Sequence, residues 1–351
     1  MKHFYRFIYI NLVLIGFTST SLIAGNPDRA GQAGATELLI NPWARSSGWG
    51  TANSGSIRGV EAIFGNVAGI AFTKKTDISV THTQWLKGSD IRVNAFGLTQ
   101  KMGESSVLGF AVMAMEFGDI SVTTVDLPEG GLGTFSPSLI NINFSYAKIF
   151  SRSIYGGINI KIIDEGISNV NAGGFAVDAG IQYVTGNNEE QDNLKFGIAL
   201  KNVGTPMKFG GDGLSTRVTT AGGYELTVEQ RSANFEIPSL VNIGATYDIH
   251  PAKDHRLSVA GTFTSNSFTQ DQYALGLEYG FKNYLMLRGG FTYEENIFDD
   301  ILRTNASSGP SAGFSLMIPF GKSGKSFDLD YSYRASTPFD GSHSFGAIFT
   351  L

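Results

Sequence analysis

Tyr273-Ala-Leu-Gly-Leu-Glu-Tyr-Gly-Phe281 carries the pattern that decides the fold of this chain. Large apolar side chains occupy every second position of the stretch, and small or charged residues lie between them. Because successive side chains of a strand point to opposite faces, this period of two predicts a strand with one apolar and one polar face. The same alternation returns in Ile140–Tyr146, Leu194–Leu200 and Phe327–Tyr333. The chain is therefore expected to consist mainly of such strands.

The predicted strands are long. Most run to roughly ten residues, the length that a tilted strand needs to cross a bilayer, whereas strands of soluble proteins average about five or six. A soluble β-sandwich shares the alternation but gives no reason for this length. An even strand number is the rule in single-chain bacterial barrels. We count about 14 strands, at residues 76–84, 90–100, 106–117, 138–148, 153–164, 173–185, 194–203, 240–249, 255–265, 272–282, 284–293, 311–320, 326–335 and 342–351.

The connections between these strands alternate in length, as short periplasmic turns and long external loops do in outer-membrane barrels. Residues 217–228 could form another strand, but we assign them to a long external loop, as a hairpin above the membrane. The sequence therefore predicts an all-β fold, a transmembrane antiparallel β-barrel that crosses the outer membrane of a Gram-negative bacterium many times. The short connections are 101–105, 150–153, 282–283 and 321–325, and the long ones are 118–137, 204–239 and 294–310.

The composition indicates a surface that water covers only in part. Charged residues make up 16% of the chain and hydrophobic residues 42%, against a charged share of roughly 25% in soluble proteins. The net charge is −5 and no basic run occurs, so no nucleic-acid partner is expected. The absence of cysteine excludes disulfides, thiolate catalysis and cysteine–zinc sites. Because no histidine pair has metalloprotease spacing and no phosphate-binding loop occurs, we predict no catalytic residue, metal or cofactor.

The N-terminal residues have the features of a secretory signal. Lys2 and Arg6 precede an apolar run from Phe7 to Phe17, and Ala24 offers a small residue for cleavage. The run is shorter than the ~20 residues of a transmembrane helix, and a membrane anchor is the alternative. We assign residues 1–24 to a signal peptide, 25–70 to an N-terminal plug on the periplasmic side, and 71–351 to the barrel.

Two segments before the first predicted strand carry a recognisable pattern. They read Ala35-Thr-Glu-Leu-Leu-Ile-Asn-Pro-Trp-Ala-Arg-Ser-Ser-Gly-Trp-Gly50 and Glu61-Ala-Ile-Phe-Gly-Asn-Val-Ala-Gly-Ile70. This resembles the start of the PorV/PorQ family, within the wider group shaped like the fatty-acid transporter FadL. That family has Asn-Pro-Ala-Gly where this chain has Asn66-Val-Ala-Gly69. A second match joins Leu200-Lys-Asn-Val-Gly-Thr-Pro206 to Asn242-Ile-Gly-Ala-Thr-Tyr247.

The resemblance implies a 14-stranded barrel of the Bacteroidetes outer membrane that serves type IX secretion, as a cargo carrier or as a subunit of the attachment complex. Its implied partners are outer-membrane lipid, other outer-membrane or surface proteins, and secreted cargo. The leading hypothesis is thus a non-enzymatic binding and scaffold subunit in protein export. Two alternatives stay open: an accessory subunit of another outer-membrane machine, such as barrel insertion, and a FadL-like transporter of hydrophobic small molecules. The polar inward faces weigh against the transporter.

Candidate functional residues fall into three sets. In the plug, Arg45 is expected to contact Asp328 or Asp330, or else to lie in solvent, and Asn66 and Gly69 are expected to form a turn. Polar-face charges are expected inside the barrel, either paired in a plugged lumen or lining a polar conduit. The plug set is Pro42, Arg45, Gly48, Gly50, Asn66 and Gly69, and the lumen charges are Arg92, Lys161, Asp178, Glu278, Arg288, Asp328, Asp330 and Arg334.

The third set lies in the long loops. Apolar side chains in such loops indicate either a partner site or a loop folded into the barrel mouth. The adjacent acids Asp299 and Asp300 are a weak indication of calcium. The candidate partner residues are Ile120, Val125, Leu127, Leu132, Phe135, Ile297 and Phe298.

Overall fold

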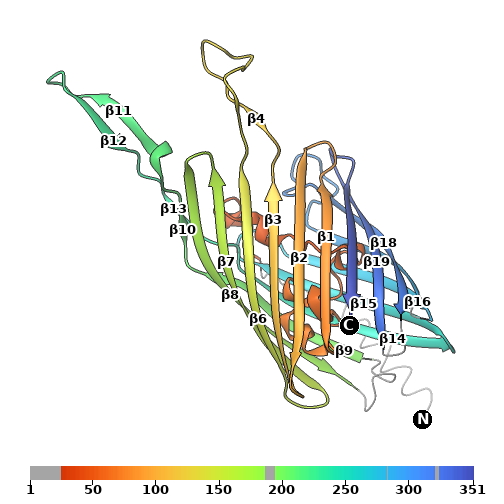
Figure 1. Ribbon diagram of the computed structural model, residues 1–351. Coiled ribbons are helices and arrows are strands. Elements are labelled where there is room, and N and C mark those ends of the chain that lie inside the picture. The colour runs from red at the N-terminus through yellow and green to blue at the C-terminus, as the bar shows by residue number, and fades with distance from the viewer. Residues whose placement is uncertain (1–24, 186–193, 283, 321–323) are drawn as a thin grey trace.

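The computed structural model, which describes residues 25–185, 194–282, 284–320 and 324–351, is a closed antiparallel barrel (Figure 1). Each strand pairs with its neighbours along the chain, and β1 closes the ring by pairing with β20 from Asp77–Thr350 to Gln84–His343. A closed ring has no free edge, as lipid demands of any spanning sheet. Within the described ranges no helix is long and apolar enough to cross a membrane.

The barrel has the fourteen strands that the alternation predicted. They are β1 (Thr76–Trp85), β2 (Ile91–Met102), β3 (Ser106–Glu116), β6 (Ser138–Ile149), β7 (Ile154–Ile167), β8 (Val170–Val184), β9 (Leu194–Gly204), β14 (Leu240–Ala252), β15 (His255–Asn266), β16 (Gln272–Phe281), β17 (Leu285–Glu294), β18 (Ser307–Phe320), β19 (Lys325–Ser336) and β20 (Ser342–Thr350).

Large apolar side chains lie outside the barrel and small or polar ones inside, the reverse of a soluble protein. On β16, Leu275 is 68% exposed, while its neighbour Ala274 is buried. The outer face is therefore suited to lipid and the inner face to a packed, partly polar interior. The predicted outer-membrane β-barrel fold is confirmed.

The connections define two ends of the barrel. The long ones lie at the loop end, where two hairpins rise well above the rim (Figure 1). One contains β4 (Ile120–Ser121) and β5 (Thr134–Phe135). The other contains β10 (Met207–Lys208), β11 (Ser215–Thr219), β12 (Glu225–Glu229) and β13 (Asn234–Phe235), and includes the hairpin predicted at 217–228. The opposite end, which contains the connections 103–105, 150–153 and 253–254, is the turn end, and it is periplasmic in barrels of this kind.

The N-terminal segment, residues 25–73, is buried in the lumen from Ala35 onward (Figure 1). The prediction placed this segment at the periplasmic side, but it begins at the loop end. Asn26 donates to the Asn266 carbonyl, and Arg29 pairs with Glu236 at 3.0 Å. The segment then descends until Thr73 bonds Asp77 at the start of β1. Its helices are η1 (Pro27–Arg29), η2 (Thr36–Leu39), α2 (Ala44–Gly48), η3 (Gly59–Ile63) and η4 (Val67–Phe72); η6 (Asp212–Leu214) lies in a loop. The predicted signal peptide lies outside the described residues.

Candidate ligand-binding cavity

A hollow of about 510 Å³ occupies the loop end of the lumen, above the N-terminal segment. The segment forms its floor, and the walls come from strand ends around the barrel. A concave hollow in which apolar side chains meet convergent polar groups is the usual form of a small-molecule site. The larger apolar lining residues are Ile40, Phe64, Trp85, Met115, Phe117 and Ile297, and the carboxamides are Asn41, Asn53, Asn242, Asn266, Gln272 and Asn305.

The polar groups of the cavity differ in how far they are satisfied. Glu294 accepts hydrogen bonds from Gln272 and Asn305, each at 2.8 Å, and from the Thr304 hydroxyl. The guanidinium of Arg334, which is half-buried, has no hydrogen bond or ion pair with any residue that the structure describes. This guanidinium is therefore free to meet a polar group of a ligand. A second cation of the lining, Lys201, donates to the Phe64 carbonyl at 2.7 Å.

One half of the lumen, formed by β2, β3, β6 and β7, holds the N-terminal segment by apolar packing. Trp43 is fully buried, and its ring lies edge-on to Phe64 with centroids 5.9 Å apart. A Cβ on Gly97 of β2 would lie 2.5 Å from Val60 and 3.1 Å from Trp43, so glycine is needed for this contact. The apolar half extends through a cluster that includes Ile63, Val67, Val107, Met113 and Leu139.

Asn66 anchors the segment to the wall between β8 and β9. Its amide nitrogen donates to the carbonyls of Ile181 and Ile198, at 3.1 and 3.4 Å, and to that of Ser54 at 3.3 Å. A Cβ on Gly180 would lie 2.2 Å from the Asn66 oxygen, and one on Gly197 2.7 Å from its nitrogen. The two glycines therefore form a notch that admits this carboxamide.

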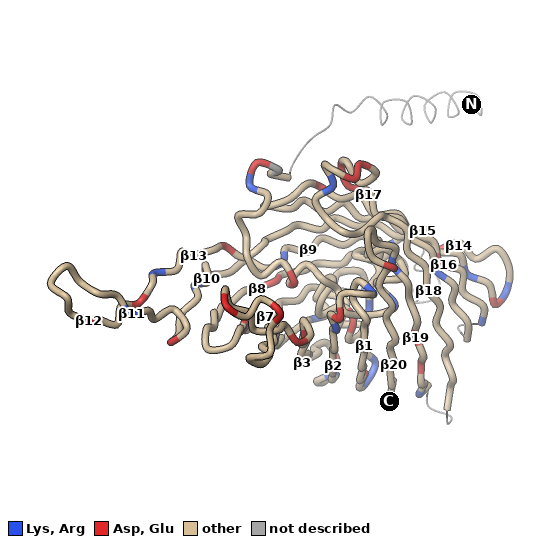
Figure 2. Tube along the Cα trace, turned by 90° about the horizontal axis from the view of Figure 1, so that it is seen from above, with Lys and Arg blue, Asp and Glu red and all other residues tan. Residues whose placement is uncertain are grey.

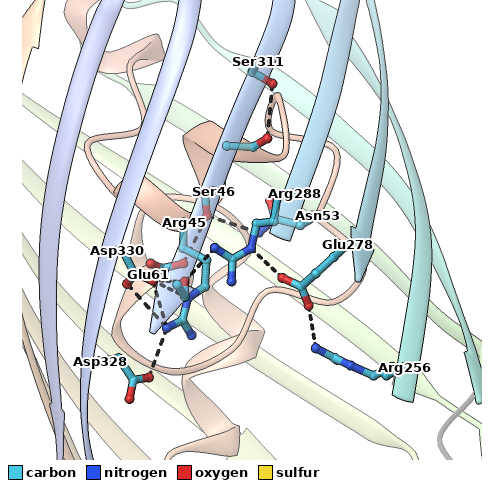
Figure 3. Close-up of polar contacts among 12 residues, drawn as sticks. Arg45, Ser46, Asn53, Glu61, Arg256, Glu278, Arg288, Ser311, Asp328 and Asp330 are labelled. Atoms are coloured by element: carbon cyan, nitrogen blue, oxygen red, sulfur yellow. Dashed lines mark hydrogen bonds and ion pairs between the residues drawn. The ribbon is translucent and has the colours of Figure 1, made fainter. Parts of the chain in front are cut away.

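In the opposite half of the lumen, formed by β14 to β20, ion pairs hold the segment (Figure 3). A smaller apolar contact joins Trp49 and Ala52 of the segment to the wall at Ala260 and Ala274. Arg45 pairs with Asp328 at 3.1 Å and with Asp330 at 3.3 Å, both on β19. Glu61, also buried on the segment, accepts a hydrogen bond from Ser46. Both aspartates are almost fully buried, so removing Arg45 would leave two buried carboxylates without their cation.

The charged half continues along the wall toward the turn end (Figure 3). Arg288 pairs with Glu278 at 2.5 Å, and Glu278 also pairs with Arg256 at 2.5 Å. Beside them Lys195 pairs with Asp248 at 2.5 Å. The charges thus alternate in sign from the segment to the periplasmic mouth.

The structure gathers the plug residues named from the sequence inside the barrel. Pro42 is buried, and Arg45 makes the predicted contact with Asp328 and Asp330. A Cβ on Gly48 would lie 3.2 Å from Gly313 of β18. Gly50 has a φ of +64°, and a Cβ on Gly69 would lie 2.1 Å from the Ile57 carbonyl. Asn66 does make a turn contact with Ala68, but its bonds to the wall were not foreseen.

The predicted lumen charges are inward with one exception. Arg92 is exposed on the outer face of β2, together with Phe96. The prediction was wrong because it assigned a polar residue inward, although alternation places Arg92 with Phe96 and leaves Val93 and Ala95 inside. Lys161, Asp178, Glu278, Arg288, Asp328 and Asp330 are buried, and Arg334 lines the cavity.

The loop residues divide between surface and cavity. Val125 is 98% exposed, and Phe298 is 77% exposed. Ile297 is 4% exposed and lines the cavity, so its assignment to a partner surface was wrong. Ile120, Leu127 and Leu132 are exposed and Phe135 is half-buried. Among the residues that the structure describes, no group of three or more metal-binding side chains occurs, including at Asp299 and Asp300.

Sequence reasoning missed the cavity and part of the charged half. The sequence analysis did not single out four charged residues of this half: Glu61, Lys195, Asp248 and Arg256. Glu61 begins the second quoted stretch of the N-terminal segment, and the other three lie on polar faces of strands. The alternation of β14, in which Asp248 shares a face with Thr246 and Gly244, is a signal that could have found one of them.

Comparison with solved structures shows which known fold this barrel shares. No family model and no curated protein matches the sequence. The Pseudomonas putida toluene transporter TodX matches with a TM-score of 0.53 at 12% identity, over 84% of this chain and 94% of that chain. A Pseudomonas aeruginosa FadL homologue matches with a TM-score of 0.50 at 12% identity, over 87% and 96%. The chain is an outer-membrane barrel with a FadL-like fold, and the proteins that it resembles are named as transporters and channels rather than enzymes. None of these matches supports the narrower resemblance to PorV/PorQ.

Proposed function

We propose that this barrel binds a hydrophobic small molecule in its loop-end cavity and passes it across the outer membrane. The observation that carries the proposal is the cavity itself, which joins Trp85, Met115 and Phe117 to Arg334, a cation without an ion partner among the described residues. A neighbour of the same fold is named as a toluene transporter. The transfer of an apolar molecule from water into such a hollow is favourable.

Part of the polar inward faces, which weighed against transport, is engaged outside the cavity. Lys161 pairs with Asp178 at 2.8 Å, and Asn159 bonds Ser145 and Asn143, each at 2.8 Å. These groups satisfy one another below the cavity and do not line it. This part of the inward polarity therefore stabilises the barrel interior, while the cavity combines apolar side chains with polar groups of its own.

Passage requires movement of the N-terminal segment, because it fills the lumen below the cavity. Thr51, Asn53 and Phe64 of the segment lie in the cavity floor. A ligand in the cavity would touch them and could alter how the segment sits in the lumen. We infer that the structure is the closed state of this path.

The cavity can be tested with the fluorescent hydrophobic probe N-phenylnaphthylamine, excited where tryptophan does not absorb. Met115→Trp would place an indole ring in the cavity and narrow it, because Met115 is buried and lines it. Leu108→Trp, on the outer face of the same strand, is the matched control. We expect the first variant to lose saturable probe binding and the second to retain it. Equal binding by both variants would refute the cavity as the site.

A second candidate, a subunit of protein export, is favoured by the projecting hairpins and by the loop between β17 and β18. Val125, Tyr224 and Ile301 are 98%, 75% and 91% exposed, and such apolar groups often mark partner sites. Mild-detergent extraction of the tagged chain would test this candidate by what copurifies. Stoichiometric recovery of a secretion translocon or secreted cargo supports it, recovery of barrel-insertion proteins favours that machine, and recovery of the chain alone counts against both.

A further inference from the structure

A hollow of about 500 Å³ lies at the turn end, remote from the ligand cavity. It forms where the turn between β14 and β15 meets the turn between β16 and β17. The Lys282 amide donates to the Asp254 carbonyl at 2.8 Å, which fixes the two turns to each other. Lys253, Arg256 and Lys282 line the hollow together with His250 and His255.

Positive charge is in excess here, although the whole chain carries a net charge of −5. The hollow contains three permanent cations and one carboxylate, Asp254. One layer deeper, Asp248 and Glu278 are already held by Lys195 and Arg288. The two layers together contain five cations and three carboxylates, so their net charge is +2. Figure 2 shows Lys and Arg gathered near the far ends of β14 and β16.

The cations of the hollow have hydrogen-bond donors that no acceptor of the described residues engages. Within the described ranges neither Lys253 nor Lys282 forms an ion pair, and the Lys282 ammonium lies 5.5 Å from the Phe281 ring centre. Arg256 contacts Glu278 and Asp248, but its buried Nε has no acceptor in the described part of the protein. A Cβ on Gly280 would lie 3.5 Å from that Nε, so glycine keeps the space beside it open.

We propose that this hollow binds a phosphate group. Ammonium and guanidinium donors reach it from two turns and from β15, which suits an oxyanion with several acceptor oxygens rather than a single flat carboxylate. Tyr279, Phe281 and Tyr284 are exposed close by, as in the aromatic girdle at a membrane interface. The phosphate could therefore belong to an inner-leaflet phospholipid or be free in the periplasm. This inference does not depend on the proposed transport function.

The test uses the full chain in a phosphate-free sugar detergent. Inorganic phosphate and soluble dihexanoyl phosphatidylglycerol are titrated separately by calorimetry. Lys253→Gln with Lys282→Gln removes two exposed charges without disturbing the buried network. Lys101→Gln with Lys148→Gln removes the same charge at the same end of the barrel but on the opposite wall.

The first double variant is expected to weaken binding about tenfold or more, because hydrogen bonds to charged groups are strong, while the control keeps the original affinity. Binding of inorganic phosphate identifies the free anion, and binding of the lipid alone identifies the headgroup. If neither probe binds, or if both double variants lose affinity equally, the phosphate site is wrong. Circular dichroism of each variant verifies that the barrel is intact.

Discussion

The two halves of the lumen hold the same segment by different physics. On the β2–β7 side, Trp43, Val60 and Ile63 pack against the wall with almost no exposed surface. On the β14–β20 side, Arg45 lies between two aspartates of β19, and its side chain is still 25% exposed. In apolar packing, every buried methylene stabilises the folded state. A buried ion pair, by contrast, stabilises the folded state little more than a well-packed apolar substitute would.

This difference indicates what each half contributes. The apolar half supplies stability, since losing it would leave a cavity that the wall cannot refill. The charged half supplies position, since Arg45 finds its partners only in one register of the segment against β19.

The largest effect is expected from Trp43→Ala. Truncating a fully buried tryptophan removes apolar contact and leaves a cavity, which costs about 3–5 kcal/mol. Hydrogen exchange of residues 41–70 would report this as a lower free energy of segment opening. Phe96→Ala on the lipid face serves as the control. Equal hydrogen exchange in the two variants would contradict the claim that the apolar half is the main source of stability.

Arg45→Met should destabilise the segment by about 3 kcal/mol, because Asp328 and Asp330 would stay buried without their cation. The triple variant with Asp328→Asn and Asp330→Asn should recover most of this loss, since no buried charge remains unpaired. The same exchange measurement applies. A triple variant as unstable as the single one would show that the charged half is a net source of stability, against the comparison drawn above.

Gly180→Ala tests the notch at the boundary of the two halves. The new methyl group would lie 2.2 Å from the Asn66 oxygen and would displace the carboxamide, at about 1–3 kcal/mol. Gly173→Ala on the same strand is the control, because its nearest contact is 4.0 Å away. Thermal denaturation of both variants should show a lower midpoint for the first alone. A normal midpoint for Gly180→Ala would mean that Asn66 does not anchor the segment.

The smallest effect is expected at Asp299, outside both halves. The Leu302 and Ile301 backbone amides donate to its carboxylate and hold the pKa of Asp299 below its ordinary value. A lowered folded pKa stabilises the loop above the unfolded pKa, and this contribution is lost as pH falls through the folded pKa. NMR of residues 299–302 should show the loop loosening only under acid conditions. Asp299→Asn should remove that pH dependence while leaving segment exchange unchanged.

Much of the fold could be predicted from the sequence, because the alternation of apolar and polar residues is a local pattern. The period of two in Tyr273–Phe281 was enough to place a strand and its faces. Arg45 could be matched to Asp328 and Asp330 because an isolated buried cation needs an anion. Arg92 was misplaced because polarity was given more weight than its alternation with Phe96.

The cavity was out of reach for a different reason. Its lining residues, such as Trp85, Met115 and Ile297, come from strand ends and loops with no common spacing. The notch for Asn66 likewise depends on two glycines in different strands, Gly180 and Gly197. Such sites are set by closure of the barrel and by the course of the segment through it, which no single stretch of sequence encodes.

The central claim is that the N-terminal segment closes a path for a hydrophobic molecule and must move to open it. A Cβ on Gly48 would lie 3.5 Å from that of Ser332, a separation that suits a disulfide. Because the chain has no cysteine, Gly48→Cys with Ser332→Cys would form a single reversible bond between segment and β19. The measurement is uptake of N-phenylnaphthylamine into liposomes containing this variant. Our account predicts uptake when the bond is reduced and none beyond empty liposomes when it is oxidised; equal uptake in both states would contradict it.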